Sequence, residues 1–292
     1  MDTLKLGNTK VTWLNGGITK MDGGAMFGPV PKPLWSRKYP CNEHNQIELV
    51  TEPILVEKEG THYLIDGGIG KGRLSEKQLK NFGASEGVPL EEDLAKLNLK
   101  PELIDKVLMT HLHFDHVAGL VKKSGDKLVP AFPNAEIIVE RREWEAIKYP
   151  MKRTQGTYWE ENWKTIEKQV ILFDSYYQAA EGVELIHTGG HSPGHCLVKL
   201  TDQDKVAVHF SDILPTHAHM NPLWVSAFDD YPLNTIEAKE KWLPEAVNNQ
   251  WVILFYHDAY YRALKFNGNP KEGQVVLKRT KTPAIEFDGP FN

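Results

Sequence analysis

The chain has 292 residues, of which 41% are hydrophobic and 25% are charged, and its formal net charge is −5. These proportions are typical of a globular protein with a sizeable core, and they exclude a disordered or fibrous chain. The acidic balance argues against a nucleic-acid partner or an anionic membrane surface, because both require a basic face.

The first predicted elements are strands. Short alternating runs at residues 4–6, 11–14, 53–57 and 61–65 are each bounded by Gly, Pro or Asn. The N-terminal run lacks the basic and apolar regions of a signal peptide, and no apolar stretch is long enough to span a bilayer. Only two cysteines occur, so no disulfide framework is implied. We therefore expect a cytoplasmic protein without a membrane segment.

A long segment, residues 19–49, separates the second and third predicted strands. It is rich in Gly and Pro and also carries Met26, Phe27, Trp35 and other large apolar side chains. Long irregular segments within compact domains are usually functional. We predict an extended loop that serves as a lid or an interface arm, and the alternative is a loop that packs its own aromatics onto the core.

The remaining chain mixes helices and strands. Helical patterns occupy residues 75–82, 89–97, 142–148, 158–167 and 234–246, and strand patterns occupy residues 106–109, 135–139, 183–187, 196–200, 206–210 and 251–256. This alternation indicates an α/β protein with sheets buried beneath helices. No linker divides the chain, so residues 1–292 are predicted to form a single domain.

The clearest chemical signal is the run HLHFDH, which directly follows the predicted strand at 106–109. His111, His113, Asp115 and His116 place three imidazoles and one carboxylate within six residues. Imidazole and carboxylate groups are typical ligands of zinc and similar metals. In extended backbone, His111 and His113 project to the same side, and a following turn would direct the other two side chains to a neighbouring position. The motif therefore predicts a site for two adjacent ions.

One cluster cannot complete two metal sites, and further ligand-type residues follow later strands. His191 lies in the stretch HTGGHSPGH, Asp212 follows the strand at 206–210, and His257 ends the strand at 251–256. Each residue alone is weak evidence, because a single Asp after a strand is more often a turn residue. In this order and together with HLHFDH they predict a dinuclear centre.

The pattern HLHFDH, GGHSPGH, SD and YHD resembles the metallo-β-lactamase superfamily, from about Pro53 to His257. The stretches DGGAMFGPVPKPLW, NQIEL, PTHAHMNPLW and FYHDAYYRALKF are similar to the N-acyl-homoserine lactone lactonases, and most of all to a bacillus-type quorum-quenching lactonase. The resemblance implies a four-layer αββα sandwich. It also implies that His111, His113 and His191 bind one metal, that Asp115, His116 and His257 bind the second, and that Asp212 bridges both.

This resemblance implies a hydrolase that opens the lactone ring by attack of a metal-bridging hydroxide. The cofactors are two divalent ions per chain, expected to be Zn²⁺, with Co²⁺, Mn²⁺ and Fe²⁺ also compatible with N/O ligands. Asp115 is expected to shuttle a proton to the leaving alkoxide. The partners are a small lactone or ester substrate and, in a homodimer, a second copy of the chain. The alternatives are an organophosphate triesterase or arylesterase, and a non-catalytic metal-binding sensor.

The sequence also supports predictions for residues outside the proposed ligand set. His195 is expected to fix the ligand loop near His191 and not to bind metal itself, and Asp229 and Asp230 read as solvated turn residues. His217 and His219 either contact substrate or a second subunit, or are polar loop residues. Five apolar side chains are predicted to line the substrate pocket, with a dimer interface as the competing interpretation: Met26, Phe27, Trp35, Trp224 and Phe228.

Overall fold

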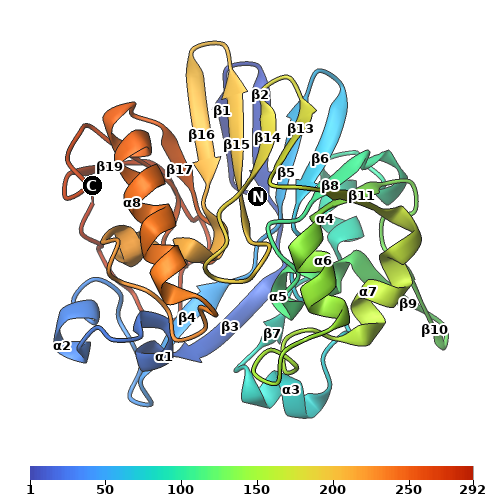
Figure 1. Ribbon diagram of the computed structural model, residues 1–292, viewed down its shortest axis with the longest axis horizontal. Helices are drawn as coiled ribbons and strands as arrows, with labels where there is room; N and C mark the ends of the chain where they lie inside the picture. Colours follow the sequence, from blue (N-terminus) through green and yellow to red (C-terminus); the bar gives the residue numbers. More distant parts are fainter. Residues whose placement is uncertain (292) are drawn as a thin grey trace.

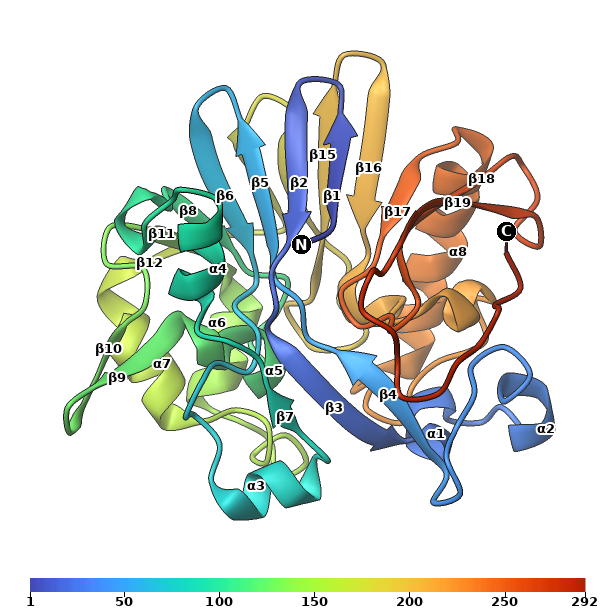
Figure 2. The same cartoon turned by 180° about the vertical axis from the view of Figure 1, so that it is seen from behind.

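Two seven-stranded sheets form the centre of the computed structural model, which describes residues 1–291 (Figures 1 and 2). The first sheet has the order β1-β2-β5-β6-β8-β11-β12. Its strands are β1 Thr3–Leu6, β2 Thr9–Trp13, β5 Ile54–Lys58, β6 Thr61–Ile65, β8 Lys106–Leu108, β11 Glu136–Glu140 and β12 Val170–Phe173. The strands β6, β8, β11 and β12 pair in parallel, so their carboxyl ends lie at the same edge of the sheet.

The second sheet has the order β13-β14-β15-β16-β17-β18-β19. Its strands are β13 Tyr176–Ala180, β14 Val183–His187, β15 Cys196–Asp202, β16 Lys205–His209, β17 Val252–Leu254, β18 Tyr261–Phe266 and β19 Gly273–Lys278. Within it β16 and β17 pair in parallel, so their carboxyl ends also share one edge.

Helices cover the outer face of each sheet. Figure 1 shows α8 against the second sheet on the left and α4, α6 and α7 against the first sheet on the right. The helices of this layer and those below it are α3 Glu76–Asn81, α4 Leu90–Lys96, α5 Phe114–Val117, α6 Arg141–Lys148, α7 Glu160–Ile166 and α8 Pro232–Asn248. The arrangement is an αββα sandwich, which confirms the predicted fold class.

The core has three apolar layers because the central strands are buried on both faces. In β8, Val107 packs against the helices that cover the first sheet. The next residue, Leu108, packs between the two sheets. In β11, Ile137 and Ile138 divide in the same way. Successive side chains of a strand point to opposite faces, so a continuous apolar run is what a doubly covered strand requires.

The segment 19–49 is not the irregular loop that the sequence predicted. It contains β3 Gly17–Asp22, α1 Gly23–Phe27, α2 Lys32–Trp35 and β4 Gln46–Val50. β3 pairs with β4 on one side and with β7 Ser85–Glu86 on the other, which gives a three-stranded sheet. Asp22 caps α1 by accepting a hydrogen bond from the backbone N of Ala25. Pairing across more than twenty intervening residues leaves no short-range turn signal, which explains the wrong prediction.

Smaller elements connect the layers. A hairpin of β9 Val121–Ser124 and β10 Lys127–Pro130 projects beside α7. Single turns of 3₁₀-helix occur at η1 Pro101–Leu103, η2 Ala118–Leu120, η3 Glu167–Gln169, η4 Ser211–Ile213 and η5 His217–Met220. Within residues 1–291, no helix is both long and apolar enough to cross a membrane.

Candidate metal centre

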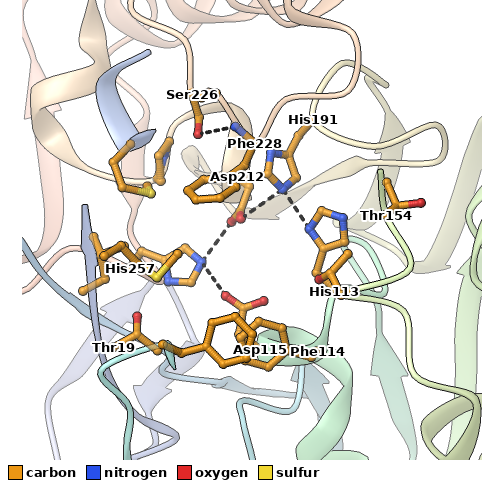
Figure 3. A pocket seen from close by; sticks show the side chains of 18 of the residues that line it. Thr19, His113, Phe114, Asp115, Thr154, His191, Asp212, Ser226, Phe228 and His257 are labelled. Atoms are coloured by element: carbon orange, nitrogen blue, oxygen red, sulfur yellow. Dashed lines mark hydrogen bonds and ion pairs between the residues drawn. The ribbon is translucent and has the colours of Figure 1, made fainter. Parts of the chain in front are cut away.

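The predicted ligands lie at the carboxyl ends of four strands, at one edge of the two sheets. β8 leads into the segment with His111, His113, Asp115 and His116, and β14 leads into the loop with His191. Two further residues follow β16 and β17: Asp212 and His257. His113 has extended backbone (φ −61°, ψ 153°) and precedes α5, so the helical turn redirects the side chains of Asp115 and His116. Figure 3 shows the side chains that it labels from these segments pointing into a common space.

All seven residues come together, in three overlapping groups. The groups are His111, His113 and His191; His111, His116 and Asp212; and Asp115, His116 and His257, and within each group the ligand atoms lie within 4.8 Å of one another. Asp212 is central, because its Oδ2 lies 3.3 Å from Nε2 of His191 and its Oδ1 lies 3.1 Å from Nε2 of His257 (Figure 3). The two oxygens of one carboxylate thus face two different sets of histidines.

The chemistry of these atoms fits bound cations. Nε2 of His111 is buried and has no hydrogen-bond partner in the described structure, and Nδ1 of His113 faces Nε2 of His191 at 3.0 Å. Nε2 of His116 and Nε2 of His257 face each other at 3.2 Å. Buried polar atoms normally have a partner. A metal ion would supply one for each of these nitrogens, and the N/O donor set suits zinc and its neighbours in the first transition row.

The electrostatics of the site hold two histidines and the central carboxylate in the protonation states that bind metals, whereas Asp212 and the neighbouring carboxylates outweigh burial and raise the pKa of His116 and of His191. Burial lowers the pKa of His111 and of His113 well below the usual value, so both are neutral at pH 7. Burial opposes ionisation of Asp212, but His257, His116 and the other histidines around it hold the pKa of this carboxyl well below its usual range. Neutral imidazole and ionised carboxylate are the ligand forms.

Two buried carboxylates contact predicted ligands, and the sequence analysis did not single out either of them for this role. Asp66 Oδ2 lies 2.8 Å from Nδ1 of His116 and also accepts a hydrogen bond from Thr110 Oγ1 at 2.7 Å. Asp229 Oδ1 lies 2.8 Å from Nδ1 of His191. Asp229 is 4% exposed, so its prediction as a solvated turn residue was wrong. The available signal for Asp66 was its position directly after the buried strand β6, in IDGG.

Asp230 also differs from its prediction as a solvated residue. It lines the cavity above the centre, its side chain is 2% exposed, and its Oδ1 accepts a hydrogen bond from Nε of Arg153 at 3.1 Å. Its backbone N donates to the carbonyl of His191 at 3.0 Å. The DD pair is therefore buried because the loop that carries it folds back over the ligand loop.

Three further histidines, His195, His217 and His219, hold backbone segments in place. Nε2 of His195 accepts a hydrogen bond from the backbone N of Asp212 at 3.2 Å, and His195 belongs to none of the three metal-type groups. His217 pairs with Asp258 at 2.6 Å and with the carbonyl of Lys38 at 3.0 Å. His219 donates to the carbonyl of Met26 at 2.9 Å. His217 and His219 do not line the cavity; they join its two flanking segments.

A cavity of about 420 Å³ opens above the centre. Met26 and Phe228, two of the five predicted pocket residues, line it. Phe27 and Trp35 do not, because both are fully buried and stack with ring centroids 4.9 Å apart. Trp224 packs edge-on against Phe27 instead of facing the cavity.

The apolar wall of the cavity has a different origin from the one predicted. Its members come from the three-stranded sheet and the segments beside it, with Phe228 from the later loop: Met21, Met26, Leu49, Phe82, Phe114 and Phe228. Phe82 and Phe114 stack with centroids 4.4 Å apart. Arg153 and Thr154 also line the cavity, so its lining combines apolar and polar side chains.

Fold and centre together define an αββα protein with a His/Asp metal-binding site at the edge of its sheets. Residues 49–257 match the family model described as the metallo-beta-lactamase superfamily. The chain belongs to this superfamily and is a hydrolase of the metal-dependent kind.

Several characterised relatives and solved structures are similar to this chain. An N-acyl homoserine lactonase from Bacillus sp. is 30% identical over 228 residues, which cover 72% of this chain and 83% of the relative. An N-acyl homoserine lactonase from Bacillus cereus is 32% identical over 161 residues, or 52% of this chain and 58% of the relative. The structure of a probable metal-dependent hydrolase from Staphylococcus aureus superposes with a TM-score of 0.92 at 46% identity, and covers 96% of this chain and all (100%) of the other.

A more distant structure shares only the fold. AidC, a dizinc quorum-quenching lactonase, superposes with a TM-score of 0.76 over 96% of this chain and 98% of its own, at 17% identity. The superposition extends over almost the whole chain, so the layers and their order are common to both proteins.

Proposed function

We propose that this protein is a lactonase with two divalent metal ions that opens the lactone ring of N-acyl-homoserine lactones. The observation that carries the proposal is the position of Asp212, whose two carboxylate oxygens lie 3.3 Å and 3.1 Å from nitrogens of His191 and His257. A carboxylate placed in this way can give one oxygen to each of two neighbouring ions. The lactonase relatives support the choice of substrate class.

In this proposal, His111, His113 and His191 hold one ion, Asp115, His116 and His257 hold the other, and Asp212 contributes an oxygen to each. Two bound cations would lower the pKa of a shared water towards ~7 and stabilise charge on the carbonyl oxygen during ring opening. Zn²⁺ is the proposed metal, because three neutral imidazoles are a common zinc ligand set.

Asp115 is the proposed proton carrier for the leaving alkoxide. Its side chain is 19% exposed, whereas that of Asp212 is 11% exposed, and it lines the cavity where a substrate would lie. Its Oδ2 lies 3.7 Å from Nε2 of His257, and its backbone carbonyl accepts a hydrogen bond from Tyr256 Oη at 2.8 Å. A carboxylate fixed through its backbone and open to the cavity can accept a proton and return it to substrate.

The cavity supports a substrate with one apolar arm. Met26 and Phe228 belong to its apolar wall, which suits the acyl chain, while the lactone carbonyl would lie over Asp212. We also propose that the chain forms a homodimer through the segment 19–49, in which Leu34 of α2 is 52% exposed. Light scattering tests this state independently of activity.

Metal analysis combined with turnover tests the function. The purified chain should contain two metal ions and hydrolyse a series of acyl-homoserine lactones, and dialysis against a chelator should abolish turnover until Zn²⁺ is restored. Aryl esters and organophosphate triesters are assayed with the same preparation, because a nucleophile between two cations can attack phosphorus as well as carbon. Full activity after complete metal removal, or turnover confined to the triesters, would overturn the proposal.

A further inference from the structure

Glu143 of α6 makes an unusual set of contacts beside the metal centre. Its Oε1 accepts hydrogen bonds from the backbone N of Leu112 at 2.9 Å and from Tyr158 Oη at 2.7 Å. Its Oε2 accepts hydrogen bonds from Ser192 Oγ at 2.6 Å and from the backbone N of Gly194 at 3.0 Å. Glu143 is 1% exposed, and its four hydrogen bonds match the number of acceptor positions that a carboxylate offers.

These contacts join the two loops that carry the ligands of one metal group. Leu112 lies between His111 and His113, and Ser192 directly follows His191. The loops are about eighty positions apart in the sequence, and one carboxylate therefore bridges them immediately behind the ligands. We infer that Glu143 is a positioning residue that sets the separation of the HLHFDH and GGHSPGH segments and thereby the affinity of the centre for metal.

The loop that carries His191 lies so close to α6 at Gly194 that no side chain fits there. A Cβ atom added to Gly194 would lie 2.3 Å from the backbone N of Glu143 and 2.4 Å from its Cβ. Any larger residue at this position would push the loop away from α6 and break the hydrogen bond from Gly194. The need for glycine at position 194, the one glycine of GGHSPGH that follows His191, is thus explained by its contact with Glu143.

Tyr158 extends the same network to His113. Its ring centroid lies 5.1 Å from that of His113, and its hydroxyl donates to Glu143. Burial, together with the charge of Glu143, raises the pKa of the Tyr158 phenol well above its ordinary value, so the hydroxyl stays protonated and remains a donor. Glu143 therefore holds one face of a ligand ring as well as both ligand loops.

The charge of Glu143 also favours cations nearby. Among the residues that the structure describes, Glu143, Asp66 and Asp229 form no ion pair with a lysine or arginine, although all three are buried. A buried carboxylate that no cation neutralises is costly even when it is hydrogen-bonded, and cations bound at the neighbouring centre would offset the cost. This inference rests on the proposed metal centre.

The test compares Glu143→Gln with Glu145→Gln, an exposed position on the same helix. The glutamine amide retains the shape but directs two N–H donors at groups that are themselves donors. We expect the affinity for Zn²⁺, measured by competition with a chromophoric chelator, to fall about 10- to 100-fold in Glu143→Gln and to stay unchanged in Glu145→Gln. The visible spectrum of the Co²⁺-loaded protein should also change, since ligand geometry determines it.

A second variant covers the case in which Glu143→Gln does not fold. Ser192→Ala removes one donor and leaves the carboxylate, and it should weaken Zn²⁺ binding several-fold with an altered Co²⁺ spectrum. Folded variants with wild-type Zn²⁺ affinity and an unchanged Co²⁺ spectrum would overturn the inference. A wild-type chain that binds Zn²⁺ but hydrolyses no lactone overturns the proposed function instead, and the Zn²⁺ measurement still decides the role of Glu143.

Discussion

Asp229 Oδ1 lies 2.8 Å from Nδ1 of His191, and both side chains are buried. The ring of His191 donates its Nδ1 hydrogen to this carboxylate, which leaves Nε2 free to face Asp212 at 3.3 Å. The other oxygen, Oδ2 of Asp229, accepts a hydrogen bond from the backbone N of Ser226 at 3.2 Å. Asp229 thus links the tautomer of a proposed ligand to the loop that forms part of the cavity wall.

We expect Asp229→Asn to weaken metal binding about 10- to 100-fold, because the amide neither carries the charge nor selects the tautomer. Chelator competition measures the affinity, and metal content after dialysis provides a second value. Asp174→Asn, at an exposed ion pair with Arg141, is the matched control and should behave like wild type. Equal affinities in both variants would show that Asp229 does not orient His191.

Asp115→Asn should leave the protein folded and reduce kcat about 10²- to 10⁴-fold, the usual range for loss of a proton-transfer group. The amide can still offer an oxygen to a metal but cannot carry a proton. Steady-state kinetics with an acyl-homoserine lactone, together with metal analysis of the same sample, separates the two roles. Unchanged turnover at full metal content would exclude proton transfer by Asp115.

Phe27→Ala should destabilise the fold by about 3–5 kcal/mol without changing the preference for acyl-chain length. Phe27 is fully buried between the rings of Trp35 and His219, with centroids 4.9 Å and 4.4 Å away. Denaturant titration measures the stability. Phe228→Ala is the complementary variant: Phe228 is 41% exposed and lines the cavity, so its loss should alter chain-length preference with little effect on stability. The reverse pattern in the two variants would contradict this assignment.

Acid should destabilise the contact between His219 and the carbonyl of Met26. Burial, with the nearby charge of Lys239, lowers the pKa of His219 from 6.5 to about 3. The unfolded chain therefore takes up this proton first as the pH falls. The stability that depends on neutral His219 is present above pH 6.5 and is lost between pH 6.5 and about 3, by up to ~1.4 kcal/mol per pH unit.

The difference in unfolding free energy between wild type and His219→Gln isolates this contribution, because the other groups titrate in both proteins. The difference should be largest near pH 7 and should shrink as the pH is lowered towards 4. A difference that is independent of pH would show that His219 does not titrate with folding.

Much of the candidate site was predictable from local patterns. A ligand-type side chain directly after an apolar strand is visible in one sequence, and His111, His113 and Asp115 follow such a strand within a few residues. Strands such as β8 and β16 were recognisable because their apolar runs are bounded by turn residues, whereas β12, β13, β18 and β19 were not predicted. The prediction of an irregular loop at residues 19–49 was wrong because β3 and β4 pair across a long connection that local patterns do not encode.

The sequence by itself determined which atoms are available to bind metal, since imidazole and carboxylate chemistry belongs to the residue and its spacing. Only the tertiary structure decided what lies behind and around them: that Asp229 and Glu143 are buried next to the ligand loops, and that Phe27 is in the core while Met26 lines the cavity. Burial and side-chain direction result from packing between segments tens to hundreds of positions apart. No property of a single segment specifies them.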